Sequence, residues 1–117
     1  MLIYNTLGRK KEEFIPAQAG KANIFFFSVT ASDQFYTLPP RSALAIARLS
    51  RQLRHMGLEV RFVRNFTDVD DKIINRANKE GRDWREVAQT YITAFHEDMD
   101  RLGVLRADEE PRATDYI

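Results

Sequence analysis

Residues 58–77 contain the feature that most constrains how this chain can fold, a strand pattern that runs directly into a helix pattern. At its start apolar and charged residues alternate, which is typical of a strand. From Val69 to Ala77 the apolar residues recur every four positions, so they share one face of a helix. The sequence therefore predicts a strand over 58–64 and a helix that begins at Val69.

Between these two patterns, Asn65 to Asp68 predict a polar turn at the carboxyl end of the strand. Thr67, followed three positions later by Asp70, can cap the helix in the manner of a capping box with a shorter acid. In open α/β sheets, ligands bind where a strand ends and the next helix begins. The turn is therefore a candidate binding site.

The acids Asp68, Asp70 and Asp71 raise the question of a metal ion. They do not fit a calcium-binding EF-hand loop, because Ile73 stands where that loop needs glycine and Lys79 where it needs glutamate. Acids in the first turn of a helix are stabilised by its dipole, so we favour a capping role. A small ligand bound by Thr67 and Asp68 is the first alternative, and a hard-cation site is the second.

A second strand is predicted upstream, over Asn23–Thr30, because this run is almost entirely apolar and rich in β-forming residues. Such a run is typical of a strand that is buried on both faces of a parallel sheet. After an irregular stretch, Pro40 suits the start of a helix. With the strand over 58–64, these elements predict a parallel strand–helix–strand unit.

The helix of this unit is predicted over Arg41–Met56. Its apolar residues recur at spacings of three and four: Ala43, Ile46, Leu49, Leu53 and Met56. Its basic residues lie mostly off that face: Arg48, Arg51, Arg54 and His55. They could contact RNA phosphate or form a solvated face that is favourable near the helix end, and we favour the solvated face.

Both ends of the chain carry weaker signals. Leu2–Leu7 predicts an edge strand, and Gly8–Glu13 an exposed charged turn rather than a phosphate site. A last helix is predicted from an Asp83 cap to Gly103, with an aromatic stripe that belongs to the core. His96 on this helix has no evident partner in the sequence, and we take it as a satisfied or exposed histidine.

Composition limits the classes of function. At 117 residues we expect a single domain over 1–117. The 18 basic and 17 acidic residues give no overall attraction to nucleic acid or membrane. There is no cysteine, which excludes thiolate metal sites in this chain. Without a secretory signal or an apolar span, we expect a cytoplasmic protein.

Several stretches together resemble the motifs of one family. These are Val63–Ile73 (VRNFTDVDDKI), Phe95–Asp100 (FHEDMD), Glu110–Thr114 (EPRAT) and the opening Ile3–Phe14. They are similar to cysteinyl-tRNA synthetases over nearly the whole chain. The resemblance implies an α/β fold with a Rossmann-like (HUP-type) parallel sheet and flanking helices. The chain would be the N-terminal part of a class I synthetase catalytic domain.

That family activates cysteine with ATP and transfers it to tRNA, with a zinc ion that binds the thiol and two ATP-site motifs, HIGH and KMSKS. The resemblance places the first zinc-ligand cysteine at Phe27 and the HIGH motif at Tyr36, Thr37, Leu38 and Pro39. We therefore expect a zinc site that is lost and filled by Phe27, no resident cofactor, and at most weak ATP binding. Aminoacylation by this chain alone is not expected.

Six positions that match the family are the candidate contacts for a nucleotide or amino acid: Thr30, Asp33, Arg41, Asn65, Thr67 and Asp68. They could equally be caps and turn residues that the fold needs. The resemblance implies a truncated synthetase-like protein that binds a nucleotide or a protein, or self-associates through an exposed sheet edge. The alternative is a fragment or subunit of a cysteine–tRNA ligase completed by another chain. Neither tRNA nor a membrane is an expected partner.

Overall fold

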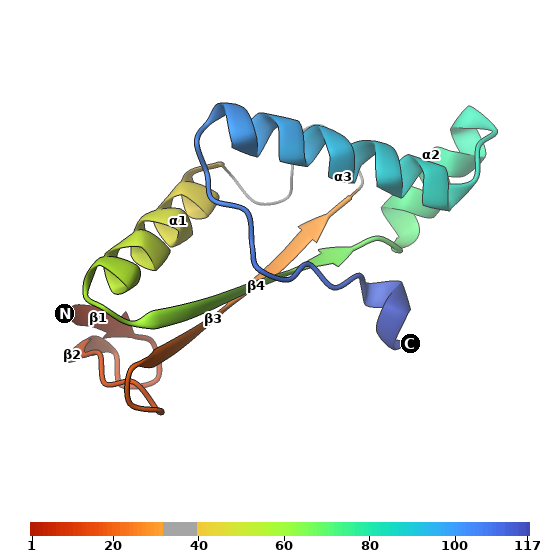
Figure 1. The fold of residues 1–117 in the computed structure, drawn as a ribbon. Helices are drawn as coiled ribbons and strands as arrows, with labels where there is room; N and C mark the ends of the chain where they lie inside the picture. The colour runs from red at the N-terminus through yellow and green to blue at the C-terminus, as the bar shows by residue number, and fades with distance from the viewer. Residues whose placement is uncertain (32–39) are drawn as a thin grey trace.

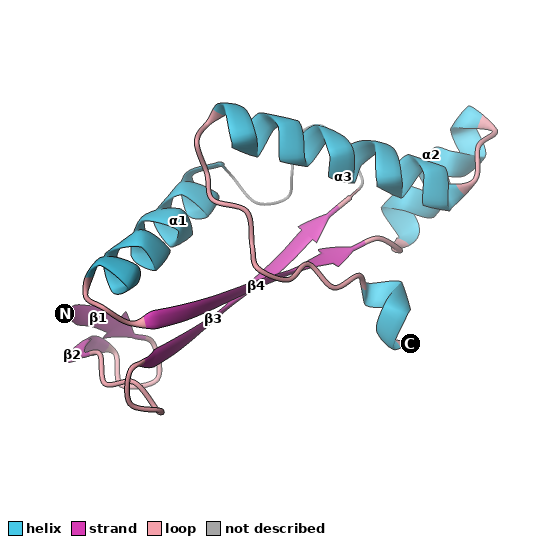
Figure 2. Ribbon diagram, in the orientation of Figure 1, coloured by secondary structure: helices cyan, strands magenta, loops and turns pink. Residues whose placement is uncertain are grey.

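The computed structural model describes residues 1–31 and 40–117, which form a mixed α/β structure (Figure 1). Its elements are β1 (Leu2–Asn5), β2 (Lys10–Glu13), β3 (Lys21–Thr30), α1 (Pro40–His55), β4 (Glu59–Thr67), α2 (Asp71–Glu80), α3 (Trp84–Arg101) and the 3-10 turn η1 (Ala113–Tyr116). Figure 2 shows α1 and α3 on the same side of the long strands β3 and β4. None of the described helices is long and apolar enough to cross a membrane.

The strands β3 and β4 confirm the predicted parallel unit. They pair in parallel from Lys21 opposite Glu59 to Thr30 opposite Thr67, with an irregularity between Phe26 and Val29. The helix α1 connects them, as the strand–helix–strand pattern predicted. This places the ends of both strands, and therefore the candidate site, at one edge of the sheet.

The strand β4 is longer than predicted and continues through Thr67. The turn expected over Asn65–Asp68 is therefore wrong. Backbone pairing explains the difference: Arg64 N donates to Glu109 O at 3.0 Å, and Phe66 N donates to Pro111 O at 2.9 Å. A strand whose polar groups are satisfied on both edges has no reason to turn early.

The partner on the outer edge of β4 is the segment 108–114, for which the sequence analysis predicted no strand. Its pairs all have one offset, 46 residues: the bridges join Val63 to Glu109 and Phe66 to Arg112. Several side-chain contacts keep the same offset; for example, Asp108 Oδ2 accepts from Phe62 N at 2.7 Å. The segment therefore lies along β4 in the register of a third parallel strand.

The strand β3 does not have two buried faces, so that prediction is wrong. Phe25 and Phe27 are 52% and 72% exposed, with ring centroids 5.0 Å apart. Phe27 consequently fills no cavity among the described residues, contrary to expectation. The reason is that the helices cover one side of the sheet, whereas the side that carries these two rings is open to solvent.

The N-terminal prediction also needs correction. Lys10–Glu13, expected in an exposed turn, is the strand β2, which pairs antiparallel with β1 from Leu2 opposite Glu13 to Asn5 opposite Lys10. Charged residues suit a small hairpin that is solvated on both faces, since its stability comes from backbone pairing and cross-strand contacts. Here Asn5 Nδ2 donates to Glu12 Oε2 at 3.0 Å.

The start of α2 differs from its prediction. Asp70, not Thr67, is the N-cap residue, and its Oδ1 accepts from Ile73 N at 2.8 Å. Because Thr67 belongs to β4, the helix begins at Asp71 rather than Val69. Two other predicted helix boundaries are confirmed. Asp83 caps α3 by accepting from Arg85 N, and Gly81 ends α2 with a φ of 64°.

Replacing Asp70 with alanine is expected to lower the free energy of unfolding by about 1 kcal/mol, because the amide of Ile73 loses its acceptor. Urea denaturation followed by circular dichroism measures the change. Asp71→Ala, one residue further along, is the matched control and should cost less, since Asp71 is exposed and makes no capping bond. Equal losses in both variants would contradict the assignment of the cap.

The core lies between the sheet and the helices. Its buried side chains come from α1, β4, α2 and α3: Ala43, Ala47, Phe66, Ile73, Ala77, Val87, Ala88, Ile92, Phe95 and Met99, with Ala31 and Val104. Two predicted members are wrong, because Met56 and Leu102 follow or end their helices and are about half exposed. The sequence missed Ser50, which is fully buried on α1.

Candidate binding site

A surface pocket of about 430 Å³ lies beside the end of β4, between α3 and η1. It is lined by Asp68, Trp84, Arg85, Ala88, Arg112, Thr114, Asp115 and Ile117. Asp68 follows β4 directly, Trp84 and Arg85 open α3, Arg112 and Thr114 come from the segment that pairs with β4, and Asp115 lies in η1. The register of that segment therefore builds the pocket.

Asp68 is the pocket residue that the sequence singled out, and it is already engaged. It is 4% exposed, and its two oxygens accept from Thr114 N at 3.1 Å and from Thr114 Oγ1 at 2.6 Å. The carboxylate thus fixes η1 to the end of β4. Asp68 therefore has a structural role. A ligand could contact its carboxylate only through the remaining acceptor positions of the two oxygens or by displacing Thr114.

The other walls combine donors with an aromatic ring. The guanidinium of Arg85 lies 4.3 Å from the centroid of the Trp84 ring. The Nη2 atom of Arg112 donates to Gln89 Oε1 at 2.5 Å. Such a wall can hydrogen-bond and stack against a small polar ligand. Among the described residues, no group of three or more histidine, cysteine, aspartate or glutamate side chains is placed to hold a metal.

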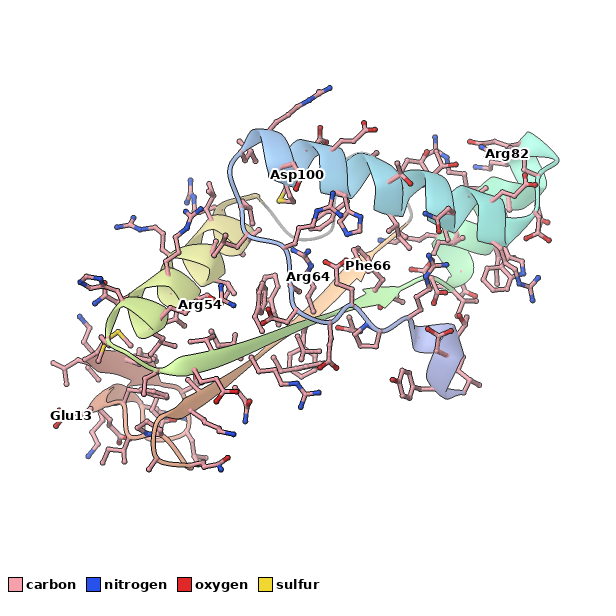
Figure 3. The ribbon with its side chains drawn as sticks, in the orientation of Figure 1. Glu13, Arg54, Arg64, Phe66, Arg82 and Asp100 are labelled. Carbon is pink, nitrogen blue, oxygen red and sulfur yellow. The ribbon has the colours of Figure 1, made fainter. Side chains whose placement is uncertain are left out.

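A buried ionic cluster, which the sequence did not predict, fixes the segment 108–114 to β4 and α3 through Glu110. Arg64 is 1% exposed and pairs through Nη2 with Glu110 Oε1, while His96 Nε2 lies 2.6 Å from Glu110 Oε2. Figure 3 shows Arg64 and Phe66 between β4 and α3. The only sequence signal for this cluster was the strand alternation, which places Arg64 on the same face as the apolar residues Phe62 and Phe66.

The guanidinium of Arg64 also lies among aromatic rings, 4.6 Å from the centroid of Phe95 and 5.8 Å from that of Phe66. Its Nε atom has no hydrogen-bond partner among the described residues. The rings and the single carboxylate of Glu110 therefore compensate this buried charge. His96, for which no partner was evident, is satisfied by a residue 14 positions further along.

The structure separates the predicted contacts. Asp68 lies on the helix-covered side of the sheet with Phe66, whereas Asn65 and Thr67 alternate to the opposite side. The backbone of Thr30 is opposite Thr67, and Arg41 is exposed in the first turn of α1. Asp33, Tyr36 and Pro39, and with them the expected HIGH positions, lie outside the described residues, as does the side chain of Thr30.

Two exposed carboxyls have lowered pKa values, and both belong to local ion pairs. A hydrogen bond from Arg76 holds the pKa of Glu80 below its usual value, and one from Arg106 does the same for the pKa of Asp100. The Asp100 carboxylate in turn raises the pKa of Arg106. None of these groups lines the pocket, so their shifts identify no site for chemistry.

A family model and several similar proteins indicate the same family. The model of the family "tRNA synthetases class I (C) catalytic domain" matches residues 13–117. The chain is 70% identical over 117 residues to a cysteine–tRNA ligase of Desulfovibrio desulfuricans, and 58% identical to those of Lawsonia intracellularis and Oleidesulfovibrio alaskensis. Each match covers 100% of this chain and 24% of the relative. The chain thus spans about a quarter of the length of these relatives.

Proposed function

The chain belongs to the class I tRNA synthetase family for cysteine, as the N-terminal part of the catalytic domain, and from this we propose that it is a non-catalytic binding scaffold. In this proposal the 117 residues do not activate cysteine on their own. The parallel unit β3–α1–β4 is part of a Rossmann-like sheet, and a nucleotide binds weakly at the ends of its strands.

The observation that carries the proposal is Phe27. The resemblance places the first zinc-ligand cysteine of the family at this position, and phenylalanine has no atom that binds zinc. The chain has no cysteine elsewhere, so no thiolate can substitute. Tyr36 and Pro39 stand at the two histidine positions of the HIGH motif. Losing one preorganised group typically costs about 10²–10³ in rate, so several such losses leave no measurable activation.

Weak nucleotide binding is supported by the pocket beside β4. Arg85 and Arg112 offer donors to phosphate or ribose oxygens, and the Trp84 ring offers a surface for a base. The site lies at the carboxyl ends of parallel strands, where open α/β sheets bind ligands. Asn65 and Thr67, on the other side of the sheet, stay candidate contacts only for a ligand that reaches that side.

A thermal-shift titration with ATP, cysteine and a non-hydrolysable cysteinyl-adenylate analogue tests this binding. We expect ATP and the analogue to raise the melting temperature, because a ligand at 100 times its Kd adds about 2.7 kcal/mol. Cysteine alone should give no shift. Arg112→Gln should weaken the ATP response, whereas Arg101→Gln on the exposed end of α3 should not. No shift with any ligand would contradict nucleotide binding.

The second candidate function is a segment of a cysteine–tRNA ligase that another chain completes. The open face of β3 favours it, since Phe25 and Phe27 are exposed side by side and β3 has an unpaired edge among the described residues. Exposed apolar rings on a free strand edge are typical of a surface that another polypeptide covers. The same surface would also serve self-association.

Light scattering on a size-exclusion column distinguishes these partners. The chain is run alone and after mixing with the part of a relative's cysteine–tRNA ligase that lies outside the matched 117 residues. A 1:1 complex would support completion, a concentration-dependent dimer would support self-association, and a monomer in both runs would contradict both. Phe25→Ser with Phe27→Ser is expected to abolish whichever complex forms.

A further inference from the structure

The segment 108–114 begins with the longest run of acids in the chain, which we call the acidic trio: Asp108, Glu109 and Glu110. Each carboxylate pairs with a different arginine, in the pairs Asp108–Arg54, Glu109–Arg61 and Glu110–Arg64. These arginines, which we call the receptor arginines, lie on α1 and β4, between 46 and 54 residues earlier than their partners. The segment is therefore docked by charge onto elements that are distant in sequence.

The backbone contributes less to this attachment than a regular strand would. Figure 1 shows the segment running along β4 from the end of α3 to η1. Arg64 N donates to Glu109 O, and in a parallel pair the residue two positions after such an acceptor donates back. That residue is Pro111, which has no N–H. The segment accordingly meets β4 through isolated bridges, and its side chains carry much of the attachment.

The edge of β4 has specific requirements that this segment meets. The charge of Arg64, which is 1% exposed, needs a carboxylate, and the amides of Arg64 and Phe66 need acceptors. An extended peptide with an acid in the right register supplies both at once. A polyanion without peptide groups would pair with the arginines but would leave the two amides unsatisfied.

We propose that the outer edge of β4, with the receptor arginines, is a binding surface for an extended acidic peptide of a partner protein. In this proposal the acidic trio occupies the surface in cis, as an autoinhibitory contact. Strand addition to a sheet edge gives affinity through the backbone, while side-chain pairs fix the register. The proposal does not depend on nucleotide binding in the pocket beside η1.

The tether of the segment determines how a partner can bind. Because the segment belongs to the same chain, it competes at a high effective concentration. A partner binds only to the fraction of molecules in which the segment has left β4, so its apparent affinity rises with that fraction. Weakening the segment without changing β4 should therefore reveal the binding surface.

Fluorescence anisotropy with a labelled peptide of residues 105–117 tests the proposal on the full chain and on its Glu110→Gln variant. Glutamine keeps the shape of Glu110 but removes the charge that holds Arg64. We expect the peptide to bind the variant at least about tenfold more tightly than the unmodified chain. Added salt should weaken this binding, since the pairs of Asp108 and Glu109 are exposed and screened.

The control peptide carries Asp108→Asn, Glu109→Gln and Glu110→Gln, and it should bind at least about tenfold more weakly. Adding Arg64→Met to the Glu110→Gln chain removes the buried charge of the surface and should cause a similar loss. Circular dichroism establishes that each variant is folded. If Glu110→Gln does not fold, Asp108→Asn with Glu109→Gln replaces it, because these substitutions loosen the segment only through exposed pairs.

Three results would overturn the proposal. The first is equal binding of the peptide to the unmodified chain and to the folded variant, because the segment would then not compete for the surface. The second is the absence of binding to the folded variant. The third is binding that neither Arg64→Met nor the neutral control peptide weakens, because the contact would then lie elsewhere on the chain.

Discussion

Replacing Glu110 with alanine is expected to lower the free energy of unfolding by about 3 kcal/mol, because it leaves the charge of Arg64 buried without its carboxylate. Arg64 is 1% exposed, and its Nε has no hydrogen-bond partner among the described residues. The substitution also removes the partner of His96. Since Glu110 lies in the segment along β4, the loss should loosen that segment and the pocket with it.

Urea denaturation of the Glu110→Ala variant measures the loss, and its neighbour supplies the control. Glu109 pairs with Arg61 at 2.6 Å, but both side chains are more than half exposed. Glu109→Ala should therefore cost less than about 1 kcal/mol. Adding Arg64→Met to Glu110→Ala should recover most of the stability, because the uncompensated charge is gone. Similar small losses at Glu109 and Glu110 would refute a buried ionic cluster.

Replacing Phe66 with alanine is expected to be the most destabilising single change, at about 4 kcal/mol. Phe66 is 2% exposed at the centre of the core. Its ring meets those of Phe95 and His96 edge to face, at centroid distances of 5.6 and 5.5 Å. Removing it opens a cavity and also takes an aromatic neighbour from the Arg64 charge.

Thermal and urea unfolding of Phe66→Ala test this expectation, with Phe25→Ala as the matched control. Phe25 has the same side chain on the partner strand but is 52% exposed, so its loss should cost less than about 1 kcal/mol. The contrast between two phenylalanines of one sheet measures how strongly its two faces differ in burial. A larger loss at Phe25 than at Phe66 would reverse the assignment of the covered face.

Local patterns were sufficient to predict the parallel β3–α1–β4 unit and most of the core. The alternation before Phe62, the four-residue spacing from Ile73 to Ala77, and the caps at Gly81 and Asp83 are each set by neighbouring residues. The predicted family is confirmed as well, since the family model matches residues 13–117.

The errors arise where distant segments decide the local structure. β4 extends to Thr67 because residues 46 positions later pair with it, and no local rule reveals that offset. Arg64 is buried because Glu110, His96 and three phenylalanine rings surround it. The apolar run in β3 predicted two buried faces because the prediction used only the apolar character of the residues. Burial also depends on which elements pack against each face, and no described element covers the face with Phe25 and Phe27.

The candidate site shows the same division. Asp68, which the sequence singled out, lines the pocket, but its hydrogen-bond partner Thr114 and the pocket residue Arg112 come from the segment 108–114, for which we predicted no strand. Thr67 and Asp68, adjacent in sequence, lie on opposite faces because the strand continues through Thr67 and its side chains alternate. Whether Thr30, Asn65 and Thr67 contact a ligand stays a prediction, as does a cytoplasmic location.

Cysteine-dependent exchange of pyrophosphate into ATP tests most directly the claim that this chain does not activate cysteine. The chain is assayed alone, with a full-length cysteine–tRNA ligase of a relative as the positive control. We expect no exchange above the background without cysteine, because phenylalanine cannot bind zinc and the resemblance places Phe27 at a zinc-ligand position and Tyr36 and Pro39 at the HIGH histidines. Cysteine-dependent exchange by the purified 117-residue chain would contradict it.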